Sequence, residues 1–194
     1  MRVAIRHADT QQERQDAESA LAEIRDRNGT AQLFAANFEP AGAGAQRAAA
    51  ITAALGHIDI LVPNASIELL EDYEATPTES FAGQIAVNPR APLELVQALL
   101  LGIKQRGWGR VLAIGSVPQL KPHPQMLTYA GTKAAVGRYT FYNNAALAAF
   151  QQLPSVASRL PLCYNSNSHD RKTARQPRAE TLPRCRGGNL RRPA

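Results

Sequence analysis

A tyrosine and a lysine four residues apart, in Tyr129-Ala-Gly-Thr-Lys133, are the residues best placed to do chemistry. Side chains at this spacing share one helix face, so the phenol and the ammonium can lie side by side. A tyrosine with a pKa near 10 is a poor base at neutral pH. A positive charge at about 4 Å is worth roughly 4 kcal/mol, enough to lower such a pKa by up to three units. The pair could then exchange a proton with an alcohol or a carbonyl. Taken alone, the spacing is also typical of a solvated helix face.

Further polar residues follow apolar runs upstream of this pair. Ser116 lies 13 residues before Tyr129, at the end of an apolar run, and Asn64 and Ala65 follow an earlier one. Asn88 lies in a long predicted helix. Ligands of parallel α/β sheets bind at the carboxyl ends of strands, which makes these residues candidates for a site. Each also has a local interpretation: Ser116 and Asn64 as turn residues, and Asn88 as a buried amide satisfied by its neighbours.

The elements that would position these residues alternate along the chain. Apolar periodicity predicts strands at 2–6, 31–36, 58–62 and 110–114. It predicts helices that begin after Asp9 or Thr10 and end at Asn28-Gly29, then at 43–55, 78–105 and 126–150. This order predicts an α/β fold, a doubly wound parallel sheet with helices on both faces.

Two details of this pattern are specific enough to test. The segment 58–62 is apolar except for Asp59, which fits a strand buried on both faces. Pro89 and Pro92 interrupt the helix 78–105, and a proline within a helix usually kinks or breaks it. We therefore expect a distortion there.

Four segments, IDILVPNAS, IAVN, GRVLAIGS and YAGTK, together resemble the short-chain dehydrogenases and reductases in order and spacing. The resemblance covers about residues 2–135. It implies a Rossmann-like fold and an oxidoreductase that transfers hydride between a nicotinamide cofactor and a carbonyl or secondary alcohol. By the same resemblance, Tyr129 would be the general acid and base, and Lys133 would lower its pKa and hold the nicotinamide ribose. Ser116 would polarise the substrate carbonyl, and Asn88 would hold a water in the proton relay.

The resemblance also implies cofactor contacts. Asn64 and Ala65 match a turn that passes beside the cofactor, and Asn37 stands where the family usually has an aspartate near the adenine. Arg6 lies at the end of the strand that selects between NAD and NADP, where a cation favours the 2′-phosphate of NADP. We therefore expect NADP rather than NAD, with an exposed Arg6 that binds no ligand as the alternative.

The sequence departs from the family pattern at both ends. It contains no Thr-Gly-x-x-x-Gly-x-Gly turn, the motif that brings backbone amides to the cofactor pyrophosphate. Segment 2–6 matches the family's second strand, so the resemblance implies that the first, central strand and the last strands are missing. We expect an incomplete sheet in which 2–6 either pairs with 58–62 or faces a gap. We also expect activity to be impaired or lost.

The net charge of +6 resides in the C-terminal part of the chain. Residues 151–194 hold nine Lys/Arg and two Asp/Glu, or +7, which leaves −1 for residues 1–150. We predict a partial Rossmann-like dehydrogenase domain at 1–150 and a basic, Pro/Arg-rich disordered tail at 151–194. Such a tail binds polyanions without specificity, so no specific nucleic-acid partner is expected.

The remaining features indicate a cytoplasmic protein, and the resemblance implies that it acts on a small-molecule carbonyl or alcohol substrate. No run of about 18 apolar residues predicts a membrane span, and the N-terminus becomes charged too early for a signal peptide. Cys163 and Cys185 form neither a disulfide framework nor a metal-ligand cluster. A second function class stays open: a non-catalytic module that associates with itself or an intact relative through helices 78–105 and 126–150.

Overall fold

The structure, a computed structural model, describes residues 2–151, and of residues 141–151 only the backbone. The predicted tail beyond residue 151 lies outside the described part. No helix among residues 2–151 is long and apolar enough to cross a membrane. The strands are β1 (Arg2–His7), β2 (Thr30–Ala35), β3 (Ile60–Leu61) and β4 (Arg110–Val111). The helices are α1 (Gln11–Asp26), α2 (Ala43–Leu55), α3 (Thr78–Ile85), α4 (Ala91–Gln105) and α5 (Leu127–Gln151), with 3₁₀ turns η1 (Tyr73–Ala75) and η3 (Val117–Gln119) and a π-helical turn η2 (Ala86–Arg90).

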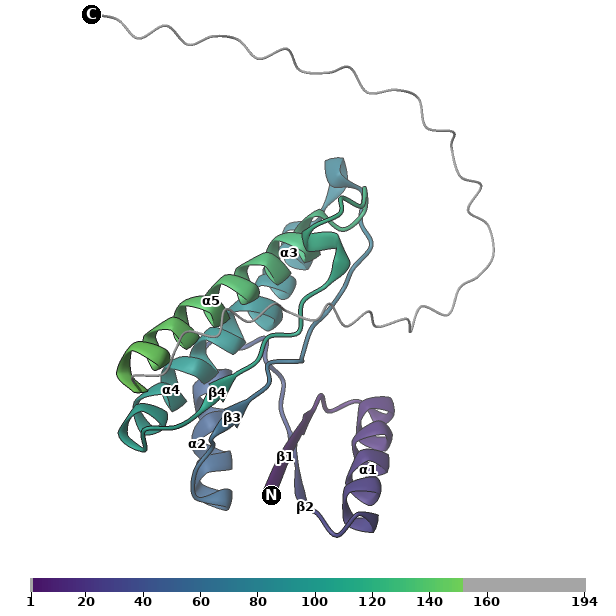
Figure 1. The fold of residues 1–194 in the computed structure, drawn as a ribbon. Coiled ribbons are helices and arrows are strands. Elements are labelled where there is room, and N and C mark those ends of the chain that lie inside the picture. Colours follow the sequence, from purple (N-terminus) through teal and green to yellow (C-terminus); the bar gives the residue numbers. More distant parts are fainter. Residues whose placement is uncertain (1, 152–194) are drawn as a thin grey trace, which may run out of the picture. The chain divides into compact units, whose positions relative to one another are not determined.

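The parallel sheet is formed in two pieces. β1 and β2 lie side by side in parallel, with Ile5 opposite Leu33 (Figure 1). β3 and β4 form the second parallel pair, with Leu61 opposite Val111. Within the part of the chain that the structure describes, no strand pairing joins β1 to β3. The predicted α/β fold with an incomplete parallel sheet is confirmed, and the direct pairing of segment 2–6 with 58–62 is not found.

The third predicted strand is shorter and more exposed than its sequence indicates. Only Ile60–Leu61 form the ladder, and the side chains of Ile60 and Val62 are each 47% exposed. The expectation of a strand buried on both faces is therefore wrong. An apolar run is buried in a parallel sheet only where neighbouring strands and helices cover it. The fourth predicted strand is likewise reduced to Arg110–Val111.

The ends of α1 follow the sequence signals. The Thr10 hydroxyl accepts a hydrogen bond from the Glu13 backbone N–H at 3.3 Å, and the Glu13 carboxylate accepts one from the Ala8 N–H at 2.6 Å. The first bond satisfies an amide that the first turn of a helix leaves unpaired, and the second ties the residues before the N-cap to that turn. Asn28, with a φ of 60°, turns the chain at the other end, as predicted.

The predicted helix 78–105 consists of three segments, and its distortion lies at Pro89. Proline has no N–H to donate within the helix and its ring clashes with the preceding turn. The chain widens there into the π turn Ala86–Arg90, a form that often occurs at functional positions. Pro92 stands in the first turn of α4, where a proline is tolerated.

The main core forms where α2 packs against α4. Gly44 allows a close approach: a Cβ built there would lie 2.6 Å from the Ala91 carbonyl oxygen and 2.8 Å from the Glu94 Cβ. The Glu94 carboxylate accepts hydrogen bonds from the Gly42 N–H at 2.9 Å and the Gly44 N–H at 3.0 Å. Glu94 therefore caps α2 from a neighbouring helix. The buried members of this core are Ala36, Phe38, Ala48, Val87, Ala91, Leu95, Leu99 and Ile103.

Replacing Gly44 by alanine should destabilise this packing. The added methyl would meet backbone that cannot move without separating α2 from α4, so we expect a loss of about 1–3 kcal/mol in the free energy of unfolding. Gly137→Ala in α5 is the matched control, because a Cβ there meets no atom within 4 Å. That control should gain up to about 1 kcal/mol. Urea denaturation measures both, and equal effects would contradict the close approach.

Candidate functional site

Tyr129 and Lys133 lie together in the first two turns of α5. Tyr129 is 7% exposed and Lys133 is 6% exposed, and the Lys133 Nζ lies 5.6 Å from the centroid of the Tyr129 ring. The structure therefore places the phenol ring and the ammonium side by side. The alternative of a solvated helix face is wrong, because both side chains are buried.

The same lysine joins α5 to the end of β4. Its Nζ donates a hydrogen bond to the Ile114 carbonyl oxygen at 3.4 Å, two residues before Ser116. Ser116 is half-buried and has an extended backbone, and the turn η3 that follows it packs against α5. The predicted tyrosine, lysine and serine are thus carried by two packed segments at the carboxyl end of a parallel strand.

The positive charge of Lys133 is costly to bury. Burial lowers its pKa, and the negative charge of Glu68, in the loop after β3, opposes this to a smaller extent. An ammonium has three N–H donors. Within the part of the chain that the structure describes, Lys133 has the Ile114 carbonyl as its only hydrogen-bond partner. Two donors remain for a ligand oxygen.

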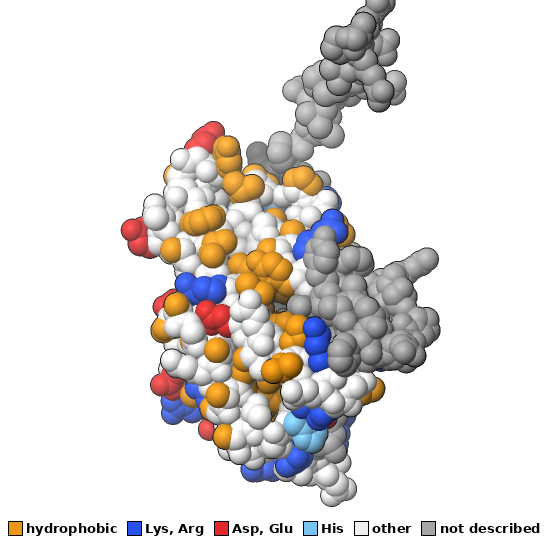
Figure 2. Space-filling view, turned by 90° about the vertical axis from the view of Figure 1, so that its left-hand side faces the viewer, with side chains coloured by type: hydrophobic (Ala, Val, Ile, Leu, Met, Phe, Trp, Pro, Cys, Tyr) orange, Lys and Arg blue, Asp and Glu red, His pale blue; other side chains and the backbone are white. Residues whose placement is uncertain are grey.

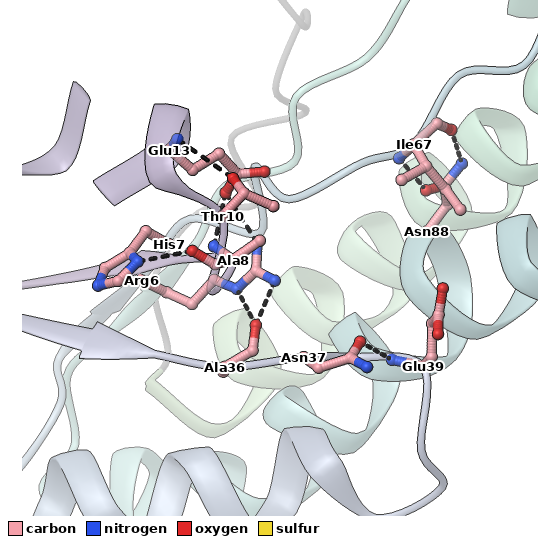
Figure 3. Close-up of polar contacts among 10 residues, drawn as sticks. All are labelled: Arg6, His7, Ala8, Thr10, Glu13, Ala36, Asn37, Glu39, Ile67 and Asn88. Atoms are coloured by element: carbon pink, nitrogen blue, oxygen red, sulfur yellow. Dashed lines mark hydrogen bonds and ion pairs between the residues drawn. The ribbon is translucent and has the colours of Figure 1, made fainter. Parts of the chain in front are cut away.

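Asn88, in the π turn, is 2% exposed and holds the loop after β3 (Figure 3). Its Oδ1 accepts from the Ile67 N–H, and its Nδ2 donates to the Ile67 carbonyl oxygen, each at 2.8 Å. The same nitrogen donates to the Thr132 Oγ1 at 3.0 Å. Of the four bonds that an amide side chain can make, three are used. A water bound by this side chain would have to use the second lone pair of Oδ1.

Thr132 is a site residue that sequence reasoning missed. It is 2% exposed, and its hydroxyl donates to the Tyr129 carbonyl oxygen at 2.7 Å. A threonine in a helix commonly bonds a carbonyl one turn earlier, so this bond follows from residue type. Its second bond, to Asn88, joins residues 44 apart in sequence. No local pattern indicates that contact.

Asn64 and Ala65 stand in the loop that Asn88 holds. Asn64 is exposed, whereas Ala65 packs against the α2–α4 core. The next residue, Ser66, has a buried hydroxyl oxygen without a partner in the described residues. The loop therefore offers polar groups that its own fold leaves unused.

Arg6 is held within the β1–β2 layer (Figure 3). Its Nε donates to the Ala36 carbonyl oxygen at 3.0 Å, and its guanidinium lies 4.6 Å from the Phe38 ring centroid and 3.7 Å from the Glu13 carboxylate. The side chain is 19% exposed, so Arg6 is partly buried rather than exposed, and its contact with a cofactor stays a prediction. Burial lowers its pKa, Glu13 raises it, and nearby Arg47 lowers it.

Asn37 is exposed, and its Oδ1 accepts from the Glu39 backbone N–H at 2.9 Å, which closes a local turn (Figure 3). No hydrogen bond or ion pair between described side chains joins Arg6 or Asn37 to the Tyr129–Lys133 pair. The predicted cofactor residues therefore form two groups with no direct bond between them: Arg6 and Asn37 in one, and Tyr129 and Lys133 in the other.

The residues present fit one end of a nicotinamide dinucleotide. The free donors of Lys133 and the adjacent phenol suit ribose hydroxyls. The pyrophosphate end differs. Gly42 and Gly44 stand at a helix N-terminus, a common place for phosphate, but the Glu94 carboxylate already accepts their N–H groups. A phosphate there would meet a negative charge.

The fold and the site together define a class: an α/β protein with parallel strands and a buried Tyr-x-x-x-Lys pair at a strand's carboxyl end. The model of the short-chain dehydrogenase family matches residues 3–151. The chain belongs to that family.

Known relatives cover different parts of the chain. Human 17-beta-hydroxysteroid dehydrogenase type 1 is 38% identical over 81 residues, 42% of this chain and 25% of the relative. L-rhamnose 1-dehydrogenase (NAD(P)(+)) of Azotobacter vinelandii is 29% identical over 136 residues, 70% of this chain and 53% of the relative. The chain thus spans from about a quarter to half the length of these relatives.

Solved structures show the same fold. A 3-oxoacyl (acyl-carrier-protein) reductase from Agrobacterium tumefaciens C58, with NADP bound, superposes with a TM-score of 0.71 and 30% identity, over 77% of this chain and 56% of that one. An NAD⁺-bound xylitol dehydrogenase, 22% identical, superposes with a TM-score of 0.65 over 76% of this chain and 56% of that one.

Replacing Lys133 by methionine should stabilise the protein at neutral pH. Burial holds the pKa of Lys133 below its ordinary 10.5, so between the two pKa values the unfolded chain binds more protons and stability rises with pH. Methionine fills the space without a charge to desolvate. We expect Lys133→Met to raise Tm at pH 7 and to lose this advantage as the pH approaches 10.5. Thermal unfolding at both pH values tests this, and a lower Tm at pH 7 would contradict the cost of burial.

Proposed function

We propose that residues 1–150 carry the catalytic residues of an oxidoreductase that interconverts a carbonyl and a secondary alcohol, with a nicotinamide cofactor. The observation that carries this proposal is the buried contact between Tyr129 and Lys133 beside the segment that leads to Ser116. Family membership supports it. Burying the charge of Lys133 lowers the stability of the fold, and two of its donors are unused. This combination favours a role in binding or catalysis.

In the proposed mechanism the chain supplies the proton transfer and the orientation. A bound nicotinamide would supply or accept hydride. The Tyr129 hydroxyl would donate a proton to the carbonyl oxygen during reduction and take it back during oxidation. Ser116 would donate a hydrogen bond to the same oxygen and polarise it. Lys133 would hold its positive charge beside the phenol and stabilise the deprotonated form, and Asn88 would fix the loop at Ile67.

NADP is the cofactor that we propose. Arg6 and Arg47 lie close enough for Arg47 to lower the pKa of Arg6, and the Arg47 Nε is buried without a hydrogen-bond partner among the described groups. Two neighbouring cations favour a phosphate over a hydroxyl. Because the sequence lacks the Thr-Gly-x-x-x-Gly-x-Gly turn and the glycine amides at the start of α2 are bonded to Glu94, we also propose that the chain has weak cofactor affinity and slow turnover.

The activity is tested with the full 194-residue chain. We expect slow oxidation of NADPH with a panel of ketones, followed at the absorbance of the reduced nicotinamide, and slower oxidation of NADH. Tyr129→Phe should abolish this turnover, because it removes the only proton that the proposed mechanism transfers. Tyr139→Phe is the control, since Tyr139 lies more than two turns of α5 beyond Tyr129 and is not among the site residues. Turnover unaffected by Tyr129→Phe would overturn the mechanism, and rapid turnover would overturn the proposed impairment.

A second function, association through helices, is supported by an apolar hollow. Phe81 and Ile85 of α3 and Leu127 of α5 are exposed, at 51%, 37% and 56%. Figure 2 shows hydrophobic side chains gathered along one face of the molecule. The residues around the hollow, whose volume is about 400 Å³, are Tyr73, Thr76, Thr78, Phe81, Ile85, Leu127, Thr128, Gly131 and Thr132. We propose that this surface pairs two copies of the chain or one copy with an intact relative.

Light scattering after size exclusion should therefore give the mass of a dimer. Phe81→Glu should convert it to a monomer, because it places a charge in the paired apolar surface. Leu120→Glu is the control, since Leu120 is 71% exposed and is not among the residues around the hollow. A monomeric wild-type chain, or equal effects of both variants, would exclude self-association through this surface.

A further inference from the structure

Two bonds of Thr132 give its hydroxyl a fixed polarity. The oxygen carries one proton, which is donated to the Tyr129 carbonyl at 2.7 Å. A lone pair is therefore left toward Asn88, whose Nδ2 donates to it at 3.0 Å. Asn88 therefore donates to Thr132, and Thr132 donates to the backbone of Tyr129. Because Thr132 is 2% exposed, water does not compete for these bonds.

This polarity selects the same orientation of the Asn88 amide as the two backbone groups of Ile67 do. With Nδ2 directed at Thr132, Oδ1 is directed at the Ile67 N–H, and the second Nδ2 hydrogen reaches the Ile67 carbonyl. A flipped amide would oppose its NH₂ group to the Ile67 N–H and its oxygen to the Ile67 carbonyl. The Thr132 hydroxyl thus adds a third bond, from α5, that reinforces the two bonds between Asn88 and the loop.

The loop matters for the site because of its neighbour in sequence. Glu68 follows Ile67 directly, and its charge acts on Lys133. Holding the backbone of Ile67 keeps the Glu68 backbone, and with it the range open to its carboxylate, near the ammonium. Asn88, Thr132 and Ile67 therefore set the relation between the loop after β3 and the helix that bears Tyr129 and Lys133.

We propose that Thr132 is a positioning residue, which holds the loop after β3 in register with the Tyr129–Lys133 turn by orienting the Asn88 amide. The part of this inference that concerns turnover rests on the proposed oxidoreductase function. Its structural part concerns the Ile67 amide alone and can be measured without any substrate.

The test compares Thr132→Val, which keeps the shape and removes the hydroxyl, with Thr132→Ser, which restores the hydroxyl. Thr140→Val is the matched control: Thr140 is also buried in α5, and its hydroxyl bonds the Val136 carbonyl at 3.1 Å within its own helix. Hydrogen exchange of the Ile67 amide is followed by NMR in the full chain. The amide of Ile103, a core residue that is 1% exposed, serves as the reference for global unfolding.

We expect Thr132→Val to speed exchange at Ile67 by about tenfold relative to Ile103. Thr132→Ser should stay within about twofold of wild type, and Thr140→Val should change Ile67 and Ile103 alike. Unchanged protection of Ile67 in Thr132→Val, or an equal loss in Thr140→Val, would overturn the inference.

Turnover is measured in parallel with the same variants. If the wild-type chain turns over, Thr132→Val should lower kcat with little change in KM, and Thr132→Ser should restore it. A lower kcat that serine does not restore would count against positioning. Absence of turnover in wild type defeats the proposed function only, because exchange at Ile67 still decides whether Thr132 orients the amide.

Discussion

A buried amide must have its hydrogen bonds satisfied, and at Asn88 this requirement joins three segments that are distant in sequence. The side chain projects from a π turn, binds both backbone groups of Ile67 and meets Thr132 of α5. Leaving one such buried group unpaired costs about 1–3 kcal/mol, so the three segments hold one another in a single arrangement. Lys133 lies one residue beyond Thr132, and its position relative to the loop follows from these bonds.

The stability of the chain comes from elsewhere in the fold. α2 and α4 pack closely at Gly44, and Glu94 satisfies the amides at the start of α2. Lys133 lowers the stability, because its ammonium is buried with a single acceptor at 3.4 Å. A core that is well packed at α2 and α4 can support a charged group at α5 that lowers stability. Such a division is expected where a residue is kept for binding or chemistry rather than for folding.

The sequence predicted the helices better than the strands, for a physical reason. Helix ends are local: Thr10 caps α1, Gly56 ends α2 with a φ of 87°, and Pro89 produces the π turn from its missing N–H. Strand burial is not local. Segment 58–62 has the composition of an inner strand, yet Ile60 is 47% exposed, because burial depends on which elements cover it. The fold class and the element order could be predicted from the sequence. Whether the first strand pairs with the third could not, and the structure shows two separate strand pairs.

The same distinction explains which parts of the site could be predicted. Tyr129 and Lys133 meet because helix geometry brings residues four apart together, so their contact is contained in one segment. The Asn88–Thr132 bond depends on the packing of two helices and has no local signal. A helix N-terminus binds phosphate through free backbone amides, and those of Gly42 and Gly44 are bonded to Glu94. The residues for proton transfer and those for holding a dinucleotide are therefore separate requirements. A motif for the first says nothing about the second, so the proposed proton transfer rests on more observations than the proposed binding of a cofactor.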